Sequence, residues 1–595
     1  MKNLWRNYGL ILFGYIILTI IFTYPIAFKI NTPFAFPTGD FGLTLWNLWW
    51  VKKALLELHT TPFFTSEIFY PTGTTLSLQQ FAWDKLLLGI PLQLIMGRIA
   101  VYNLLFLFSV VVSGFGTYLL VKHLTDHRPS AFISGIIYAF CPYHLLHYGV
   151  LDPLSIEWFP FFCLYLLKMF EGNRTKNAIS GGIFLTLISL SSWYYMVFAF
   201  LFIIIFILYF LIFEREKILC LNFIKQSLFM IITFGILIFP FAYPILKGFI
   251  TFKPLRQIPM QTSLYGFSFS PFLSVCWFVF YGYIVIVLAA SSLFKMKRYI
   301  AIFWIVIIFV FFILSVGPHP VFLGKIYDNI PLPMLILHKL PVLSLMRAPW
   351  RYMVMIMLCL AVLSGYTCKY FSRGKYAIMV LTIISLLICL EYLIIPLPAS
   401  KFTPSPIFAY LGKEKGDYAV LELPFKTMIH DGDNYVQGLN MYFQTIHQKK
   451  IIGGYINHPS PGVREFIYNT RFINIFTNPS EINTKITQIK QADCIKILKE
   501  YNIKYIIIHK EMFFNERFKP FSPKSRQEKF LRGLIPFALN PVIKLVLDSN
   551  TQSICQIFSK KEDMDNFLSS MHNLFKKPFY EDEKVIVYRT FNNYN

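Results

Sequence analysis

The sequence predicts an α-helical polytopic membrane protein with about eleven spans and a C-terminal α/β domain outside the membrane. The 595 residues are 56% hydrophobic and only 14% charged, with 63 phenylalanines, whereas a soluble chain is nearer half apolar and a quarter charged. Up to Pro396 the apolar residues gather in runs of about 20, enough to cross ~30 Å of hydrocarbon. Beyond Pro396 these runs stop.

The first span is predicted at residues 8–28, after Lys2 and Arg6. Its charged flank is like that of a signal peptide, but the apolar run is too long and no small-residue cleavage site follows. We therefore expect a retained helix with its N-terminus inside the cell.

Ten further apolar runs predict spans at about 101–121, 131–149, 155–170, 178–194, 196–213, 223–247, 271–294, 299–316, 351–369 and 376–396. Five short connecting loops are basic and fall on one side of the membrane under this count. Because positive charge gathers in cytoplasmic loops, this is the cytoplasmic side. The basic residues of the five loops are Lys122, His123 and Arg128; Lys168, Arg174 and Lys176; Arg215, Lys217 and Lys225; Lys295, Lys297 and Arg298; and Lys369, Arg373 and Lys375.

The long loops then lie outside, at about 30–100, 143–157, 248–270 and 317–350. The segment 84–98 is too short and begins with two charges, so we expect an interfacial or re-entrant helix there. The predicted domains are a transmembrane domain at 1–397, containing the external loop 30–100, and an extracytoplasmic α/β domain at 398–595.

The last 200 residues alternate strand-like and helix-like patterns. Strands are predicted at 418–424, 450–455, 505–509, 542–547 and 584–588, with a helix at about 491–501. A segment of this size can bury its own core. We therefore expect a separate domain tethered to the membrane.

Charge and motifs exclude several function classes. The net charge of +24 is explained by the cytoplasmic loops, so no nucleic-acid partner is predicted. No P-loop, dinucleotide fingerprint, nucleophile elbow, HExxH or CxxC zinc spacing is present in the sequence. This argues against an ATP-driven pump and a zinc protease.

Some basic residues are predicted on the outer side of the membrane, although basic residues usually gather in cytoplasmic loops. These residues are candidates for binding a lipid phosphate. Arg347 and Arg351 stand four residues apart in Arg347-Ala-Pro-Trp-Arg351, and Lys253 and Arg256 lie in an earlier loop. The arginine fork binds phosphate oxygens in a bidentate manner. The alternative is that these side chains reach toward anionic headgroups at helix ends. His319 is a further candidate for lining the substrate cavity.

Acidic residues are few on the outer face, which makes each a candidate for catalysis. Asp40 is the strongest, in Phe36-Pro37-Thr38-Gly39-Asp40-Phe41, where the chain leaves the first span. An aromatic and basic stretch follows, which we interpret as an amphipathic helix at 43–58. Asp40 is predicted to be the catalytic carboxylate. The alternatives are a helix cap or a solvated loop residue.

Asp152 and Glu157 flank a short outer turn, and an ionisable residue at such a boundary is a site candidate. Capping before Pro153 is the alternative for Asp152. His144 and His147, three residues apart on one helical face, can bind a metal together with Asp40 or Asp152. The alternative for the histidines is that they cap backbone carbonyls at a helix end.

Five short stretches carry a family resemblance: Trp46-Asn-Leu-Trp-Trp50, Phe69-Tyr-Pro-Thr-Gly73, Arg347-Ala-Pro-Trp-Arg351, Gln444-Thr-Ile-His447 and Gly453-Gly-Tyr455. Together with Gly39-Asp40 and the predicted layout, they resemble the polytopic GT-C glycosyltransferases. That superfamily contains protein mannosyltransferases, the aminoarabinose transferase of lipid A and oligosaccharyltransferase. Uncharacterised bacterial and archaeal GT-C-like membrane proteins are most similar. The sequence departs from the common Asp-Glu pair of the superfamily, because Phe41 follows Asp40.

The resemblance implies transfer of a sugar, with inversion, from a polyprenyl-phosphate carrier to a glycan, lipid or protein acceptor at the cell membrane. Some members use a divalent metal ion such as Mg²⁺ or Mn²⁺ at the leaving phosphate, for which this chain offers Asp40, Asp152 and Glu157. Two alternatives stay open. One is a non-enzymatic transporter or flippase of lipid-linked glycans, and the other is an accessory membrane protein of envelope glycan assembly.

Overall fold

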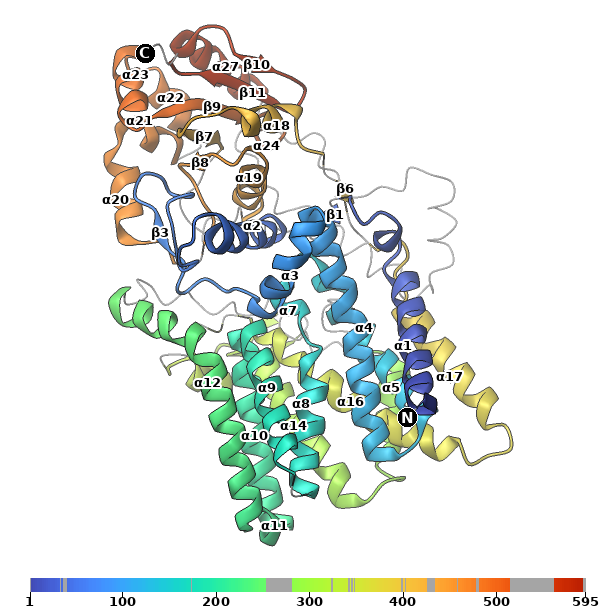
Figure 1. Cartoon of the computed structure of the whole chain (residues 1–595). Helices are drawn as coiled ribbons and strands as arrows, with labels where there is room; N and C mark the ends of the chain where they lie inside the picture. Colours follow the sequence, from blue (N-terminus) through green and yellow to red (C-terminus); the bar gives the residue numbers. More distant parts are fainter. Residues whose placement is uncertain are drawn as a thin grey trace.

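The computed structural model describes residues 2–32, 34–35, 40–172, 174–252, 281–322, 325–340, 343, 346, 348–397, 400–401, 403–424, 434–456, 458–477, 481–513 and 561–591. A bundle of long helices occupies one end of the molecule and a sheet domain the other. Helix α2 lies at the junction between them (Figure 1).

Within the described residues, seven helical stretches are long and apolar enough to cross a membrane. Shorter apolar helices accompany them, so the chain is a multi-pass membrane protein; the number of eleven spans stays a prediction. The bundle helices are α1 (Lys2–Phe22), α4 (Arg98–Thr125), α5 (Arg128–Ala139), α6 (Pro142–Leu146), η3 (His147–Gly149), α7 (Leu151–Leu154), α8 (Trp158–Glu171), α9 (Thr175–Ser191), α10 (Trp193–Phe213), α11 (Arg215–Leu219), α12 (Leu221–Phe252), α13 (Tyr283–Ser292), α14 (Arg298–Val316), η6 (Pro349–Tyr352), α16 (Met353–Phe371) and α17 (Ala377–Tyr392).

One predicted span differs from the structure. The span predicted at 131–149 is broken into α5, α6 and η3, because Pro142 has no N–H to continue the ladder of α5. Of the span predicted at 271–294, the structure describes residues 281–294, which contain the ten-residue helix α13, and the full span stays a prediction. A continuous apolar run therefore marked membrane segments well but did not predict where their helices break.

Burial distinguishes central from peripheral helices. In the stretch 128–149, 89% of the most apolar window is buried inside the protein, against 11% for α12. Large apolar side chains of α12, such as Ile231, Ile236 and Phe239, are exposed. Since a membrane-spanning face contacts hydrocarbon rather than water, α12 lies at the lipid-facing edge of the bundle, as Figure 1 also shows.

The sheet domain is built on five strands in the order β10-β11-β9-β7-β8, namely β7 (Ala419–Leu423), β8 (Lys450–Ile451), β9 (Ile503–His509), β10 (Tyr580–Glu581) and β11 (Val585–Arg589). β7 is parallel to both β8 and β9, and β11 is antiparallel to β9. Four predicted strands are thus present, with β8 shorter than predicted. The strand predicted at 542–547 lies outside the described residues.

Helices surround this sheet, and the predicted helix at 491–501 is α23. Their bounds are α18 (Pro406–Lys413), α19 (Asn434–His447), α20 (Pro461–Asn469), α21 (Arg471–Asn474), η8 (Ile475–Thr477), α22 (Ile482–Ile486), α23 (Gln491–Glu500), α24 (Lys510–Phe513) and α27 (Lys561–Phe575). A short antiparallel pair, β1 (Phe34–Ala35) with β6 (Ser400–Lys401), joins the first long loop to the chain that follows α17. The other short elements are η1 (Ile26–Phe28), β2 (Phe64–Thr65), β3 (Thr74–Thr75), β4 (Val321–Phe322), β5 (Lys325–Ile326) and α15 (Pro333–Leu337).

A buried carboxylate holds the centre of the sheet domain together. Glu422 of β7 binds the Nε2 atoms of His447 and His509, at 2.9 and 2.8 Å. The His509 ring stacks on Phe443, with 4.8 Å between ring centres. Burial alone would raise the pKa of Glu422, but the hydrogen bonds and charges of the two imidazoles outweigh burial and hold that pKa below its usual value. The carboxylate therefore stays ionised in the core.

The segment predicted as an amphipathic helix at 43–58 is α2 (Asp40–Lys52), followed by a π-helical turn, η2 (Lys53–Glu57). The amphipathic interpretation is wrong for α2, because residues 41–51 are buried except Leu43. Helix α19 of the sheet domain covers one side, and α3 (Trp83–Ile95) and α4 cover the other (Figure 1). A helix that is apolar all round is a buried helix.

Candidate functional site

Asp40 is the first residue of α2, and its side chain is half-buried. Its Oδ1 atom accepts a hydrogen bond from the Tyr455 hydroxyl of the sheet domain, at 2.9 Å. The next residue, Phe41, is buried edge-on against Tyr102 of α4, with 5.2 Å between ring centres. The carboxylate thus lies at the N-terminus of a helix, a position where acidic side chains are favoured.

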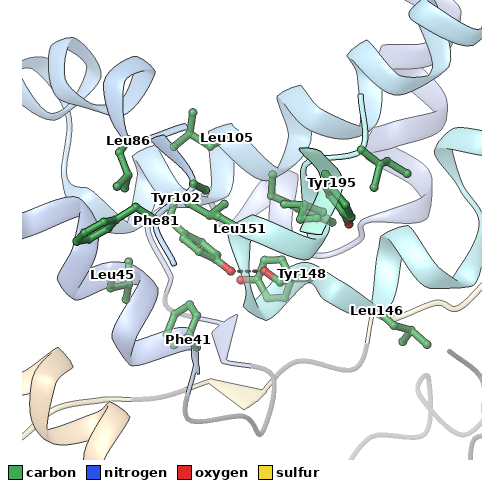
Figure 2. Close-up of a cluster of buried hydrophobic side chains, with 14 of the residues drawn as sticks. Phe41, Leu45, Phe81, Leu86, Tyr102, Leu105, Leu146, Tyr148, Leu151 and Tyr195 are labelled. Atoms are coloured by element: carbon green, nitrogen blue, oxygen red, sulfur yellow. Dashed lines mark hydrogen bonds between the residues drawn. The ribbon is translucent and has the colours of Figure 1, made fainter. Parts of the chain in front are cut away.

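Phe41 also explains why the acidic pair of the resembled superfamily is missing. A cluster of buried side chains lies beneath the start of α2, in which Phe41, Tyr102 and Tyr148 follow one another (Figure 2). The Tyr102 hydroxyl donates to the backbone carbonyl of Tyr148. A carboxylate at position 41 would have to be buried in this cluster, which costs free energy.

The same cluster brings Asp40 close to Asp152, which lies in α7 just after Tyr148. Phe41 contacts Tyr102, and Tyr102 contacts Tyr148, so the first turn of α2 lies close to the segment that leads into α7. Asp40 and Asp152, which are 112 positions apart in sequence, are thus carried by neighbouring segments.

Asp152 holds Arg351. Its Oδ2 atom lies 2.6 Å from Nη1 of Arg351, and the two side chains are only 10% and 14% exposed. The guanidinium also lies over the Tyr194 ring, 4.6 Å from its centre. Within the described part of the chain, the buried Nε atom of Arg351 has no hydrogen-bond partner. The guanidinium of Arg351 is thus held by Asp152 and Tyr194, while its Nε–H is unsatisfied within the described residues.

Glu157 belongs to a different cluster. It pairs with Lys85 of α3, and Ser109 donates to its Oε2 atom at 2.6 Å. Lys85 also lies 2.9 Å from Asp84, which accepts from the indole of Trp158 at 2.8 Å. Glu157 and Lys85 are fully buried. This arrangement fixes α3 against α8 and α4, so the predicted catalytic role of Glu157 has no support in its contacts.

The two histidines bind backbone carbonyls. His144 Nδ1 lies 2.8 Å from the Ala139 carbonyl and its Nε2 lies 3.2 Å from the Ser109 hydroxyl. His147 Nδ1 lies 2.6 Å from the Tyr143 carbonyl. Both rings therefore cap backbone carbonyls, which was the alternative to metal binding. Both ring nitrogens of His144 have partners, so neither is left to bind a metal.

The predicted metal site is not assembled among the described residues, where no three or more His, Cys, Asp or Glu side chains gather closely enough to hold an ion. One oxygen of Asp152 is bound by Arg351, and one oxygen of Asp40 by Tyr455. The positive charge beside Asp152 is supplied by a guanidinium, so these residues do not fit a divalent metal ion.

Three other predicted residues, Lys253, Arg256 and Arg347, lie outside the described residues, so their roles stay predictions. His319 follows α14, is half-buried, and has a buried Nδ1 atom without a partner in the described part of the chain.

The sequence did not predict the hydrogen bond from the Tyr455 hydroxyl to Asp40. The residue appeared in one of the short resemblance stretches, but nothing local shows that it meets Asp40, which is 415 positions away. Lys85 was also missed as a partner of Glu157, although a charged pair at the start of α3 was visible in the sequence.

Fold and site together define a multi-pass membrane protein with a carboxylate and a guanidinium gathered beside a sheet domain. No protein-family model matches the chain, and no curated protein matches it. Among solved structures it is similar to the archaeal oligosaccharyltransferase AglB from Archaeoglobus fulgidus in complex with an inhibitory peptide and a dolichol-phosphate. The TM-score is 0.49 at 11% identity, over 86% of this chain and 70% of that one.

It is also similar to the Archaeoglobus fulgidus oligosaccharyltransferase in complex with Zn and sulfate, with a TM-score of 0.48 at 10% identity, over 84% of this chain and 68% of that one. Both neighbours are oligosaccharyltransferases. At these values the similarity assigns no role to any residue of this chain.

Proposed function

We propose that the chain is an integral membrane glycosyltransferase that moves a sugar from a polyprenyl-phosphate carrier to an extracytoplasmic acceptor, with inversion. The observation that supports this most is the cation at Arg351, which is fixed by Asp152 and has a buried Nε–H that no described residue engages. A guanidinium that can bind phosphate and a carboxylate that can accept a proton are the two groups that this transfer needs.

Arg351 binds the phosphate of the carrier. Its Nη1 atom is engaged by Asp152, which leaves the Nε–H for a phosphate oxygen. The Tyr194 ring and Asp152 hold the guanidinium in place, so little reorganisation is needed when the ligand binds. As the bond between the sugar and the phosphate breaks, negative charge grows on the phosphate, and Arg351 stabilises it.

Asp40 acts on the acceptor. The acceptor hydroxyl attacks the anomeric carbon from the face opposite the phosphate, and its proton passes to the Asp40 carboxylate. The new C–O bond forms while the bond from the anomeric carbon to the phosphate oxygen breaks, and the carrier phosphate leaves with the electron pair. One displacement inverts the anomeric centre, and no nucleotide is required.

The proposal places the sheet domain outside the cell and the N-terminus inside. In Figure 1, α1 begins at the end of the bundle remote from the sheet, and the turn at α11 lies at the same end. This remote end carries basic residues, as cytoplasmic loops do.

Cysteine labelling of intact cells tests this orientation. A membrane-impermeant maleimide is expected to label Lys499→Cys in the sheet domain and to leave Lys297→Cys unlabelled, since both positions are exposed but lie on opposite sides. Labelling of Lys297→Cys from outside would reject the orientation and with it the extracytoplasmic site.

Binding of a polyprenyl phosphate in detergent tests the role of Arg351. Arg351→Ala is expected to weaken binding about tenfold or more, because a charge-assisted hydrogen bond is lost. Arg351→Lys should be intermediate, since lysine keeps the charge without the fork. Arg373→Ala removes an exposed cation at the opposite end of α16 and should bind as wild type does.

Arg351→Ala also leaves Asp152 unpaired, so its thermal stability is measured beside wild type. Arg351→Lys keeps an ion pair with Asp152 and serves if the alanine variant does not fold. Equal binding of the polyprenyl phosphate by wild type, Arg351→Lys and Arg351→Ala would reject the phosphate-binding role.

A further inference from the structure

The sheet domain is fixed to α2 by a close contact between two helices. A Cβ atom built on Gly42 of α2 would lie only 1.8 Å from the carbonyl oxygen of Gly438 in α19. Only glycine permits this approach. Because Gly42 is two residues after Asp40, the contact fixes the backbone that carries the carboxylate.

Polar contacts reinforce the same junction. The Trp46 indole donates to Oε1 of Gln444 at 2.7 Å, and Nε2 of Gln444 donates to the Glu67 carbonyl at 2.6 Å. Gln444 is fully buried. At the start of α4, Nη2 of Arg98 donates to the Thr445 carbonyl at 2.6 Å. Since buried polar groups are costly when unpaired, the junction resists separation.

The first long loop also continues the sheet. β8 is an edge strand, and residues 67–70 run beside it. The Ile451 N–H donates to the Glu67 carbonyl at 2.9 Å, and the Phe69 N–H donates to the Gly453 carbonyl at 3.1 Å. The loop thereby covers a sheet edge that would otherwise be open, and it fixes the segment that leads to Tyr455.

Tyr455 ends this segment, and its side chain returns to α2. The residue is only 5% exposed, its backbone N–H donates to Sδ of Met441 at 3.2 Å, and its hydroxyl donates to Oδ1 of Asp40 at 2.9 Å. A buried aromatic ring has few rotamers, so its hydroxyl is held in one place. The second oxygen of Asp40 is thereby aimed in a fixed direction.

We infer that Tyr455 is a positioning residue that orients the Asp40 carboxylate, so that the sheet domain completes the catalytic site. This inference rests on the proposed function, in which Asp40 accepts the proton of the acceptor. It gives the sheet domain a direct part in the reaction. The Tyr455 hydroxyl donates to the Asp40 carboxylate, and the ion pair of Asp152 with Arg351 lies in a neighbouring segment.

Tyr455→Phe tests the inference, because it keeps the ring and removes only the hydroxyl. Transfer is measured in spheroplasts of a deletion strain, as the initial rate at which the missing glycan reappears, over a series of external pH values. We expect the rate to fall about tenfold. The acidic limb of the profile should move to higher pH, since a hydrogen bond donated to a carboxylate favours its ionised form. Binding of polyprenyl phosphate should be unchanged.

Tyr418→Phe is the matched control. The Tyr418 hydroxyl donates to Glu414 at 2.6 Å, so this variant removes the same kind of bond in the same domain, away from Asp40. Asp40→Asn is measured in the same assay. If Asp40→Asn abolishes transfer while Tyr455→Phe and Tyr418→Phe have equal rates and equal acidic limbs, the inference is overturned. If Asp40→Asn retains transfer, the proposed function itself is rejected, and the inference falls with it.

Discussion

Asp40→Asn is expected to lower glycan transfer by about 10²- to 10⁴-fold, the usual loss when a general base is removed. Asparagine has the shape of aspartate and caps a helix about as well, so the fold should survive. Its side-chain oxygen can still accept from Tyr455, but it cannot take a proton from an acceptor hydroxyl. The measurement is the amount of glycan restored in a deletion strain, at matched protein levels in the membrane.

Asp417→Asn is the control for this change. Asp417 is an exposed residue of the sheet domain that pairs with Lys450, so its substitution should leave transfer near the wild-type level. Wild-type glycan from a well-expressed Asp40→Asn protein would exclude a catalytic base at this position. If that protein also bound polyprenyl phosphate normally, a transporter or an accessory protein of envelope glycan assembly would be favoured.

Lys85→Met is expected to destabilise the protein by about 3–5 kcal/mol, the usual cost of breaking a buried ion pair by removing one partner. Lys85 is fully buried between Glu157 and Asp84, and methionine would leave both carboxylates without their cation. The measurement is the thermal unfolding midpoint in detergent. Lys85→Met with Glu157→Gln should recover part of the loss, because one of the buried charges is then removed.

The comparison variant is Lys450→Met, which breaks an exposed ion pair with Asp417 and should cost at most about 1 kcal/mol. A midpoint for Lys85→Met as high as that of Lys450→Met would contradict the structural role of the Asp84, Lys85 and Glu157 cluster. Glu157 would then return as a candidate for catalysis.

Local patterns were enough to predict the long apolar helices that the structure describes and most of the sheet. Apolar runs marked the spans because hydrocarbon requires about 20 apolar residues, and the β-branched run at 506–508 marked β9. Proline at position 142 is a reason to expect a helix break there. The sequence analysis instead predicted one continuous span, because the apolar run is long enough to cross the membrane. The packing of α19 on α2 could not be predicted from local sequence, since the contacting residues Trp46 and Gln444 are 398 positions apart.

The site was predicted residue by residue but not as an arrangement. Asp40 and Arg351 stood out because charged residues are rare at the ends of apolar spans. That Asp152 binds Arg351 across 199 positions could not be deduced from spacing. Glu157 had the same local appearance as Asp152, and only the long-range contact with Lys85 separates their roles.

The short resemblance stretches take on a physical meaning once the chain is folded. Trp46 of α2 and Phe69 of the first long loop contact the sheet domain, while Gln444 and Tyr455 of the sheet domain contact α2 or that loop. Most of these residues hold the junction together rather than perform chemistry. Tyr455 differs from the rest because it reaches the carboxylate.

A structure of the protein determined with a polyprenyl phosphate bound tests the central claim most directly. The account predicts phosphate density within hydrogen-bond distance of the Arg351 Nε atom, on the side of the guanidinium that Asp152 leaves open, with the Asp40 carboxylate facing the same space. Phosphate density elsewhere, for example at the basic turns on the opposite side of the bundle, with the Arg351 Nε atom still unliganded, would contradict it.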